Sequence, residues 1–431
     1  MSHTIAIDAR KIQDFGIGTY IRNLVKHLGE LDEENRYVLL TSPAGGDLLT
    51  DLPDNFSVGV ERAPGYSVRE LLTLSWRHFR LQPDLYHATH YVLPGMIPCP
   101  AVSTIHDIIH LLYPEYLPNR FAHIYAQRMI RRTLIRSARI ITVSENTKRD
   151  LLDFFPVRED KIQVIYNGVG EVFRKPLQSQ DIDRWLRNLG VERPYMLFVG
   201  NPKPHKNLDN LVQAYARARK KQSFKAPLVC VGAREKAEFK ICQRAEQLGI
   251  RDNVLLLGHV AEEALPALYQ GADLFLYPTL YEGFGLPVVE AMASGVPVIT
   301  SNTSSLKEIA EGYAYLVDPL DIEQMAEAIA HCFGDLERRE QLAELGKRRA
   351  EEFVWRRTAE ETLAVYRRVL GMPSAGSNGV VNEAGVPNEA EVPAAGISPQ
   401  AAVRDAAQDA MSTDELGEER EATSVSEGAP R

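Results

Sequence analysis

The hydrophobic residues of this chain fall into short apolar runs that alternate with amphipathic segments. The first segment of helical spacing follows residues 4–8 and buries Ile21, Leu24, Val25 and Leu28 on one face. Short apolar runs between helical segments predict an α/β fold, in which a parallel sheet is covered on both faces. The predicted strands are 4–8, 37–41, 84–87, 101–105, 139–143 and 162–165, followed by 195–199, 227–231, 253–257, 274–277, 296–300 and 313–317.

The strands form two series, and the chain changes character between them and again near its end. Residues 171–193 are polar and lack a strand pattern, so we predict an N-terminal domain over 1–175, a linker over 176–193 and a C-terminal domain over 194–352. Residues 353–371 read as one last helix. The segment 372–431 has no aromatic residue and no lysine, which predicts a disordered acidic tail.

Charge and composition exclude several classes of protein. The tail carries eleven acids and three arginines, so it accounts for nearly all of the formal net charge of -9. The remaining chain is close to neutral and gives no support to nucleic-acid binding. No signal-type start and no long apolar window is present, which predicts a cytoplasmic protein. The four cysteines show no metal-ligand spacing and read as buried, reduced thiols.

The stretch 272–300, ADLFLYPTLYEGFGLPVVEAMASGVPVIT, predicts a strand, a glycine-rich loop, a helix and a second strand. Gly283 and Gly285 let the backbone approach a ligand, and the free amides at the helix start favour an anion. Glu282 and Glu290 flank the same loop and suit hydroxyl groups, because ionised carboxylates only accept hydrogen bonds. A nucleotide sugar satisfies both requirements. The alternative is a plain turn with two solvated glutamates.

Two places in the N-terminal half are further candidates. Gly16 and Gly18 stand in a predicted loop between the first strand and helix, but Ile21 replaces the third glycine of a dinucleotide fingerprint. The loop is then either a flexible phosphate or acceptor contact or an ordinary turn. His106 follows the strand 101–105, at the edge where parallel sheets bind ligands. It either positions a reacting hydroxyl or bonds to a loop carbonyl.

The second series carries its candidate residues on the loop GNPKPHKNL, which follows the strand 195–199. Lys206 on this loop would balance the charge of a diphosphate leaving group. The motif 181–183, Asp-Ile-Asp, resembles a metal-binding DxD, but its position in the linker argues against a metal site.

The segment 120–139 holds six arginines and no acid, interleaved with apolar residues. Such a helix either contacts an anionic membrane or is an ordinary surface helix with a cationic outer face. The sequence pattern alone favours the ordinary surface helix slightly.

Several of these motifs together resemble glycosyltransferase family 4, whose members are retaining enzymes of the GT-B fold. EGFGLPVVE has the family's Glu-x7-Glu spacing, EAMASGVPVIT matches the helix and strand that follow it, and GIGTY and TIHDIIHLLYPEY match N-terminal segments. The resemblance covers roughly residues 4–370. It implies two Rossmann-like domains whose parallel sheets face a central cleft, and a last helix that crosses back to the N-terminal domain.

The resemblance also implies roles for the residues of the donor site. Glu282 would hold the hydroxyls of the donor sugar, and Glu290 the ribose diol. Lys206 would stabilise the departing diphosphate together with backbone amides of the EGFG loop. The residues that complete the implied donor site are Gly16 and Gly18 at the diphosphate, the amides of Phe284, Gly285 and Leu286, and the backbone of His259 and Val260 at the base.

Other implied features concern the reaction itself. His106 corresponds to the family's active-site histidine, while Asn201 stands where the family often has an arginine that grips the donor phosphates. A donor phosphate oxygen would accept the proton of the acceptor hydroxyl, and neither a metal nor another cofactor is expected. The expected partners are a nucleotide sugar, with GDP-mannose preferred, and a glycan or lipid-linked acceptor.

Three other functions stay open at this point. A nucleotide-sugar epimerase of the same fold would share the loop but need no acceptor. A non-catalytic scaffold in polysaccharide assembly would explain Asn201, and a nicotinamide oxidoreductase is weakened by Ile21.

Overall fold

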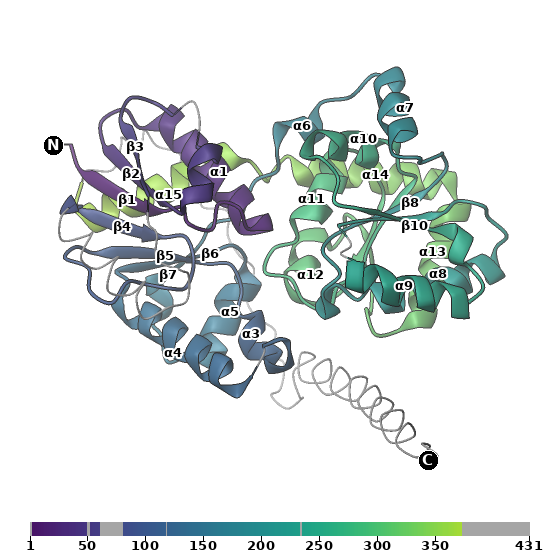
Figure 1. Ribbon diagram of the computed structural model, residues 1–431, viewed down its shortest axis with the longest axis horizontal. Helices are drawn as coiled ribbons and strands as arrows, with labels where there is room; N and C mark the ends of the chain where they lie inside the picture. The colour runs from purple at the N-terminus through teal and green to yellow at the C-terminus, as the bar shows by residue number, and fades with distance from the viewer. Residues whose placement is uncertain (1, 50–51, 61–80, 118, 233–234, 373–431) are drawn as a thin grey trace, which may run out of the picture. The chain divides into compact units, whose positions relative to one another are not determined.

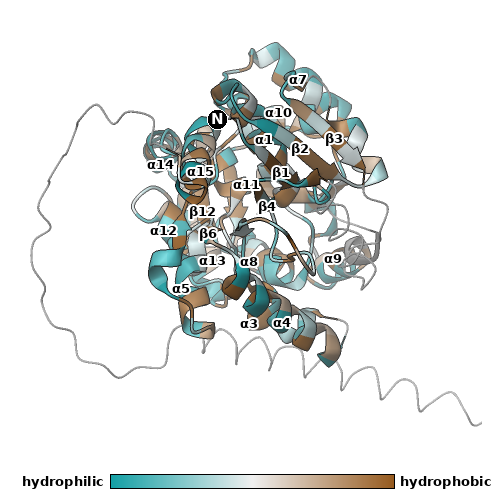
Figure 2. Ribbon diagram, turned by 90° about the vertical axis from the view of Figure 1, so that its left-hand side faces the viewer, coloured by the Kyte–Doolittle hydropathy of each residue, from teal (hydrophilic) through white to brown (hydrophobic). Residues whose placement is uncertain are grey.

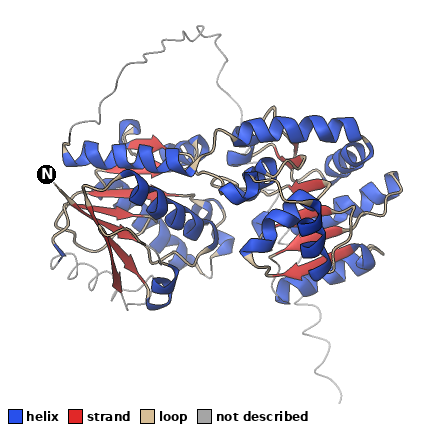
Figure 3. Cartoon of the chain, turned by 90° about the horizontal axis from the view of Figure 1, so that it is seen from above, coloured by secondary structure: helices blue, strands red, loops and turns tan. Residues whose placement is uncertain are grey.

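The computed structural model describes residues 2–49, 52–60, 81–117, 119–232 and 235–372, apart from the side chains of 235–238. Within this range the chain forms two parallel β-sheets with helices on either side of the strands (Figures 1 and 3), which confirms the predicted α/β class. Apart from its first residue, the predicted acidic tail lies outside the described residues. No helix in the described part combines the length and the apolar character needed to cross a membrane.

The N-terminal sheet has seven strands in the order β3-β2-β1-β4-β5-β6-β7. All neighbouring strands run parallel, with Ile5 opposite both Tyr37 and Leu85. The central strands are buried along their whole length because helices cover both faces. The strands of this sheet are β1 (Thr4–Asp8), β2 (Arg36–Thr41), β3 (Phe56–Val60), β4 (Leu85–Ala88), β5 (Ala101–Ile105), β6 (Arg139–Thr142) and β7 (Ile162–Val164). The helices of this half are α1 (Phe15–Leu31), α3 (Ile109–Leu112), α4 (Arg120–Arg136) and α5 (Glu145–Phe154).

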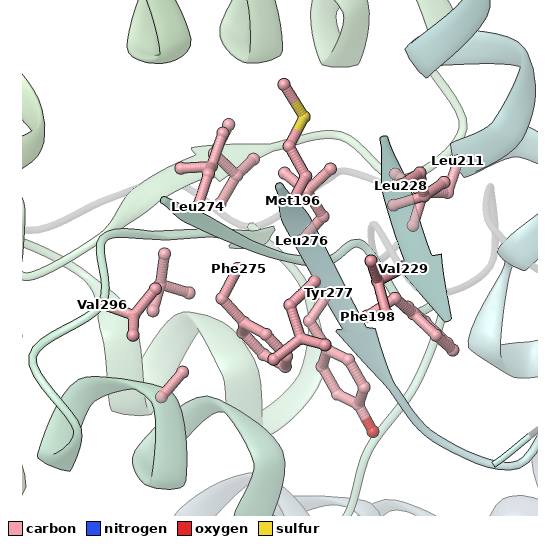
Figure 4. Packing of buried hydrophobic residues seen from close by; sticks show 14 of the residues in the cluster. Met196, Phe198, Leu211, Leu228, Val229, Leu274, Phe275, Leu276, Tyr277 and Val296 are labelled. Atoms are coloured by element: carbon pink, nitrogen blue, oxygen red, sulfur yellow. The ribbon is translucent and has the colours of Figure 1, made fainter. Parts of the chain in front are cut away.

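The C-terminal sheet has six parallel strands in the order β10-β9-β8-β11-β12-β13. Figure 4 shows its core, where Met196 of β8 lies with Leu274 and Leu276 of β11, and the ring of Phe198 lies beside that of Tyr277. The strands are β8 (Met196–Val199), β9 (Leu228–Val231), β10 (Val254–Gly258), β11 (Leu274–Tyr277), β12 (Val298–Ser301) and β13 (Tyr315–Val317). The helices are α8 (Leu208–Lys221), α9 (Glu235–Gln247), α10 (Leu265–Gly271), α11 (Leu286–Ala293), α12 (Ser304–Ala310), α13 (Ile322–Gly334) and α14 (Leu336–Ala350).

The last helix, α15 (Trp355–Leu370), packs against α1 and contributes to the N-terminal core. Trp355 and Tyr366 are buried there, and the Tyr366 hydroxyl lies 2.6 Å from Nδ1 of His87. Gly168 is required at this junction because a Cβ would collide with the backbone of Trp355. The Asn-Gly pair at 167–168 is typical of a turn, but residues 165–170 form none, and Gly168 instead permits close helix packing.

The structure contains elements that the sequence pattern did not predict. The predicted linker contains helix α7 (Ser179–Asn188), preceded by α6 (Glu171–Arg174), because Ile182 and Leu186 pack into the core. Asp181 and Asp183 lie on α7 and pair with Arg184 and Arg193, so the DxD-like motif is a set of surface ion pairs. Strand β3 was missed, since its burial alternates too weakly to be recognised. All four cysteines are free as expected, but Cys99 and Cys242 are only partly buried.

Candidate active site

The EGFG loop connects β11 to α11 at the carboxyl end of the C-terminal sheet. Gly285 precedes the helix with φ 101°, a left-handed conformation that favours glycine, and a Cβ there would collide with Leu306. Ser305 fixes the loop because its hydroxyl lies 2.9 Å from the carbonyl oxygens of both Glu282 and Phe284 and shares its one hydrogen between them. The loop is therefore held in one conformation by α12 rather than left flexible.

The start of α11 leaves backbone donors free. The amides of Val288 and Val289 bond to the Gly285 carbonyl, and Pro287 has no amide hydrogen. The amides of Phe284, Gly285 and Leu286 donate no hydrogen bond to any other residue that the structure describes. These three N–H groups, together with the positive end of the helix dipole, form a site suited to a phosphate.

Lys206 and Glu282 form an ion pair beside this loop. Lys206 Nζ lies 2.6 Å from Glu282 Oε1, and both side chains are largely buried. Tyr277 closes a triangle, because its hydroxyl accepts from Lys206 Nζ at 2.7 Å and donates to Glu282 Oε1 at 3.1 Å. An ammonium has three donors, so Lys206 keeps one for a ligand, and Glu282 keeps its second oxygen, Oε2.

Glu290 lies one turn into α11 and accepts a 2.9 Å hydrogen bond from the Tyr269 hydroxyl at Oε2. Burial raises the pKa of Glu290 from 4.5 to about 7. The carboxyl group is consequently divided between its protonated and ionised forms near neutral pH. It can then donate as well as accept a hydrogen bond, which suits a pair of vicinal hydroxyls.

His106 follows β5 at the carboxyl end of the N-terminal sheet, as predicted. Its Nε2 lies 3.0 Å from the Thr89 carbonyl, and because a carbonyl only accepts, Nε2 carries the hydrogen. Burial lowers the pKa of His106 to about 4, so the ring is neutral at pH 7. Nδ1 is then the unprotonated nitrogen and can accept a hydrogen bond from a hydroxyl group.

The EGFG loop meets the residues around His106 at Gly283. A Cβ on Gly283 would collide with the His106 carbonyl oxygen, so only glycine permits this approach. Ser144, the N-cap of α5, donates a 2.7 Å hydrogen bond to the Gly283 carbonyl, and Thr147 donates a 3.1 Å bond to the His106 carbonyl. Ser144 also caps the helix through its side chain, since its hydroxyl accepts from the Thr147 amide at 3.0 Å.

The two N-terminal glycines do not form the flexible loop that we predicted. Both lie in the first turn of α1, which begins at Phe15, and the Gly18 amide bonds to the Asp14 carbonyl at 2.5 Å. Gly18 serves packing, since a Cβ would collide with the Ile12 carbonyl. Gly16 lies beside the start of α11, where a Cβ would stand 3.7 Å from Leu286 Cδ1.

The remaining predicted donor residues are not joined to this cluster. Asn201 follows β8, and its carbonyl accepts from the Lys203 amide at 2.7 Å. After β10, His259 is exposed and Val260 is buried. Across the described residues, no hydrogen bond connects Asn201, His259 or Val260 to Lys206 or Glu282. Their assignment to the donor stays a prediction.

Sequence reasoning missed two tyrosines of the site. Tyr277 was predicted only as the last apolar residue of the strand 274–277, and Tyr269 was not singled out. Both are completely buried, and each places its hydroxyl against a glutamate. A tyrosine that ends a buried strand directly before a polar loop was the available signal for Tyr277, whereas nothing in the sequence marked Tyr269.

Comparison with known proteins identifies the class of this site. Residues 179–349 match the family model described as "Glycosyl transferases group 1", and residues 16–171 match the model described as "Glycosyltransferase Family 4". The chain is therefore a glycosyltransferase with two parallel sheets of the GT-B arrangement. Together with the relatives described next, these matches show that it belongs to glycosyltransferase family 4.

The chain is similar to several mannosyltransferases. It is 30% identical over 284 residues to the O-antigen chain mannosyltransferase B of Escherichia coli, covering 66% of this chain and 74% of that protein. It is 27% identical over 351 residues to the MMP alpha-(1->4)-mannosyltransferase of Mycolicibacterium hassiacum, covering 76% and 80% of the two proteins.

Solved structures share the fold at lower identity. HepE of Anabaena, crystallised with UDP and glucose, superposes with a TM-score of 0.71 at 20% identity, covering 85% of this chain and 100% of HepE. WaaG, a glycosyltransferase involved in lipopolysaccharide biosynthesis, gives a TM-score of 0.68 at 16% identity, covering 84% of this chain and 99% of WaaG. These likenesses support the GT-B architecture.

Proposed function

We propose that this enzyme is a retaining mannosyltransferase that transfers mannose from GDP-mannose to a hydroxyl group of a glycan or lipid-linked saccharide in surface-polysaccharide assembly. Relatives named as O-antigen and other mannosyltransferases support the sugar and the pathway class. The observation that carries the proposal is the Lys206–Glu282 pair beside three free amides of the EGFG loop.

In this proposal the diphosphate lies against the amides of Phe284, Gly285 and Leu286. Lys206 uses its remaining donor to neutralise the charge that develops on the leaving group, which is a function of electrostatic preorganisation. Neither a metal nor another cofactor is assigned to this step. The nucleotide base would contact the backbone near His259 and Val260, with Asn201 and Gly16 at the edges of the phosphate site.

The two glutamates bind different hydroxyl groups of the donor. Glu282 Oε2 accepts from the sugar hydroxyls while Oε1 stays bonded to Lys206 and Tyr277. Glu290 binds the ribose diol. Because Lys206 and Tyr277 hold Glu282 in place before the donor arrives, little conformational entropy is lost when the sugar binds.

Neutral His106 accepts a hydrogen bond at Nδ1 from a hydroxyl group of either the donor or the acceptor, and thereby orients that group. Because its pKa is low, His106 is a weak base and does not hold a second proton at neutral pH. As the resemblance to family 4 implies, we assign the acceptor proton to an oxygen of the departing diphosphate, on the face of the sugar from which the leaving group departs. This arrangement retains the anomeric configuration. We place the reaction in the cytoplasm, in keeping with the free cysteines.

A thermal-shift screen against GDP-, UDP-, ADP- and dTDP-sugars tests the donor. A ligand that binds only the folded state at 100 times its Kd stabilises it by about 2.7 kcal/mol, so GDP-mannose should raise the Tm most. A larger shift with a UDP-sugar would overturn the choice of donor. Turnover of GDP-mannose that is independent of an added acceptor would instead favour an epimerase.

Retention is tested separately by NMR of the product. The proposal requires an α-linked mannose from the α-linked donor, and a β-linked product would contradict it.

A further inference from the structure

Helix α4 exposes a stripe that combines large apolar and cationic residues. Phe121 is 82% exposed and Ile135 is 68% exposed, although both side chains are large and apolar. Ile124, Arg128 and Arg131 are also exposed. Successive members of this group are three or four positions apart, so they lie on one face of the helix. We call these five residues the α4 stripe.

The charge of α4 is not neutralised on the helix. No aspartate or glutamate occurs between residues 120 and 139. On other surface helices, arginines pair with a glutamate one turn away, as Arg348 does with Glu344 and Arg356 with Glu360. No such pair can form within α4, because the helix contains no acidic residue.

A shallow depression beside the stripe is lined by Arg128, Arg131, Arg132, Ile135 and Arg136. Arg132 also holds the neighbouring loop, since its Nη2 donates to the carbonyls of Pro94 at 2.6 Å and Gly95 at 2.5 Å. The next residue of that loop, Met96, is 58% exposed. Four guanidinium groups around one apolar residue match a surface that presents phosphates above an acyl layer.

We infer that the α4 stripe docks on an anionic phospholipid bilayer, with its apolar residues in the interface and its arginines against lipid phosphates. Charge complementarity selects an anionic partner, and Phe121, Ile124 and Ile135 require an apolar layer beneath that charge. A nucleic acid offers phosphates without such a layer. Figure 2 shows brown and teal segments alternating along α4 at the lower edge of the molecule.

The position of α4 connects this surface with the acceptor side of the active site. His106 and Asp107 are followed almost at once by α3, and α3 packs against α4. Nδ1 of His123 on α4 lies 3.2 Å from the His110 carbonyl on α3. Docking through α4 would therefore hold the segment of His106 next to a bilayer. The inference uses the proposed lipid-linked acceptor only to explain the purpose of docking, and binding itself is independent of the donor.

Co-sedimentation of the full chain with vesicles tests docking without turnover. We expect binding to vesicles containing phosphatidylglycerol, weakened by salt, and much less binding to pure phosphatidylcholine. Each cation near an anionic surface contributes about fivefold, so R128Q with R131Q should reduce the partition coefficient by roughly 30-fold. F121S with I124S should also weaken binding, because these changes remove apolar side chains that enter the bilayer interface. Both residues are exposed, so the variant should keep the fold.

The matched control is R338Q with R348Q on α14, which removes the same charge from a different surface and should leave binding within twofold. A wild-type chain that does not sediment with anionic vesicles overturns the inference, as does equal binding by the α4 and α14 variants. The thermal shift with GDP-mannose should be the same for all these variants. A failure of docking with an intact shift would leave the proposed function standing.

Discussion

Replacement of Lys206 by methionine removes the ammonium group but keeps most of the apolar stem. In the structure Lys206 Nζ lies 2.6 Å from Glu282 Oε1 and 2.7 Å from the Tyr277 hydroxyl, and its side chain is 16% exposed. If Lys206 stabilises the departing diphosphate, its loss removes one preorganised donor from the transition state. Such a loss costs about 3–4 kcal/mol, or a factor of 10² to 10³ in kcat.

The same substitution also affects stability. Breaking a fully buried pair costs about 3–5 kcal/mol and an exposed pair contributes less than about 1 kcal/mol. With side chains 16% and 12% exposed, the Lys206–Glu282 pair lies between these limits. We expect a loss of about 1–3 kcal/mol, which lowers the Tm by several degrees and leaves the protein folded at 25 °C.

The assay measures GDP released from saturating GDP-mannose in the presence of acceptor extract, with unfolding followed by calorimetry. Lys203→Met is the matched control, because Lys203 is exposed on the same loop. Its kcat should stay within threefold of the wild type. A folded Lys206→Met enzyme with kcat within threefold of the wild type would refute the role of Lys206 in charge stabilisation.

Three further predictions concern neighbouring residues. Gly283→Ala places a Cβ against the His106 carbonyl and should cost about 1–3 kcal/mol in unfolding free energy together with most of the activity, whereas Gly46→Ala, with its nearest neighbour at 4.0 Å, should change neither. Glu290 has its pKa raised to about 7, so the folded protein holds a proton that the unfolded chain releases near 4.5. The contribution of protonated Glu290 to stability, at most about 3 kcal/mol, is lost as the pH rises through 7. Glu290→Gln should therefore abolish the part of the Tm difference between pH 5 and pH 8 that Glu290 causes. An unchanged Tm difference would contradict the raised pKa of Glu290. Tyr277→Phe keeps the buried ring but loses the bonds to Lys206 and Glu282, so kcat should fall about tenfold with the donor KM changed less than threefold; an unchanged kcat would make Tyr277 a packing residue only.

Most of the fold could be predicted from the sequence because both sheets are parallel and buried on both faces. Continuous apolar runs such as 101–105 and 274–277 then mark strands directly, and both coincide with observed strands. The prediction failed where burial is one-sided. Strand β3 alternates weakly, and α7 is polar except for the few residues that it buries.

The site was predictable where the local chain determines the geometry. Gly285, Pro287 and Glu290 define the loop and the helix within a few residues, and the structure places them as the spacing indicated. Contacts between distant segments carry no local signal. The bonds from Tyr269 to Glu290 and from Ser144 to Gly283 join residues far apart in sequence, so a single sequence does not disclose them.

The central claim is that the EGFG loop and Lys206 hold the diphosphate of a nucleotide sugar. A crystal structure of the complex with GDP-mannose tests it most directly. The account predicts diphosphate oxygens within hydrogen-bonding distance of the Leu286 amide and of Lys206 Nζ, with the mannose hydroxyls at Glu282. A diphosphate bound elsewhere, with Lys206 and Glu282 paired and untouched by the ligand, would contradict it.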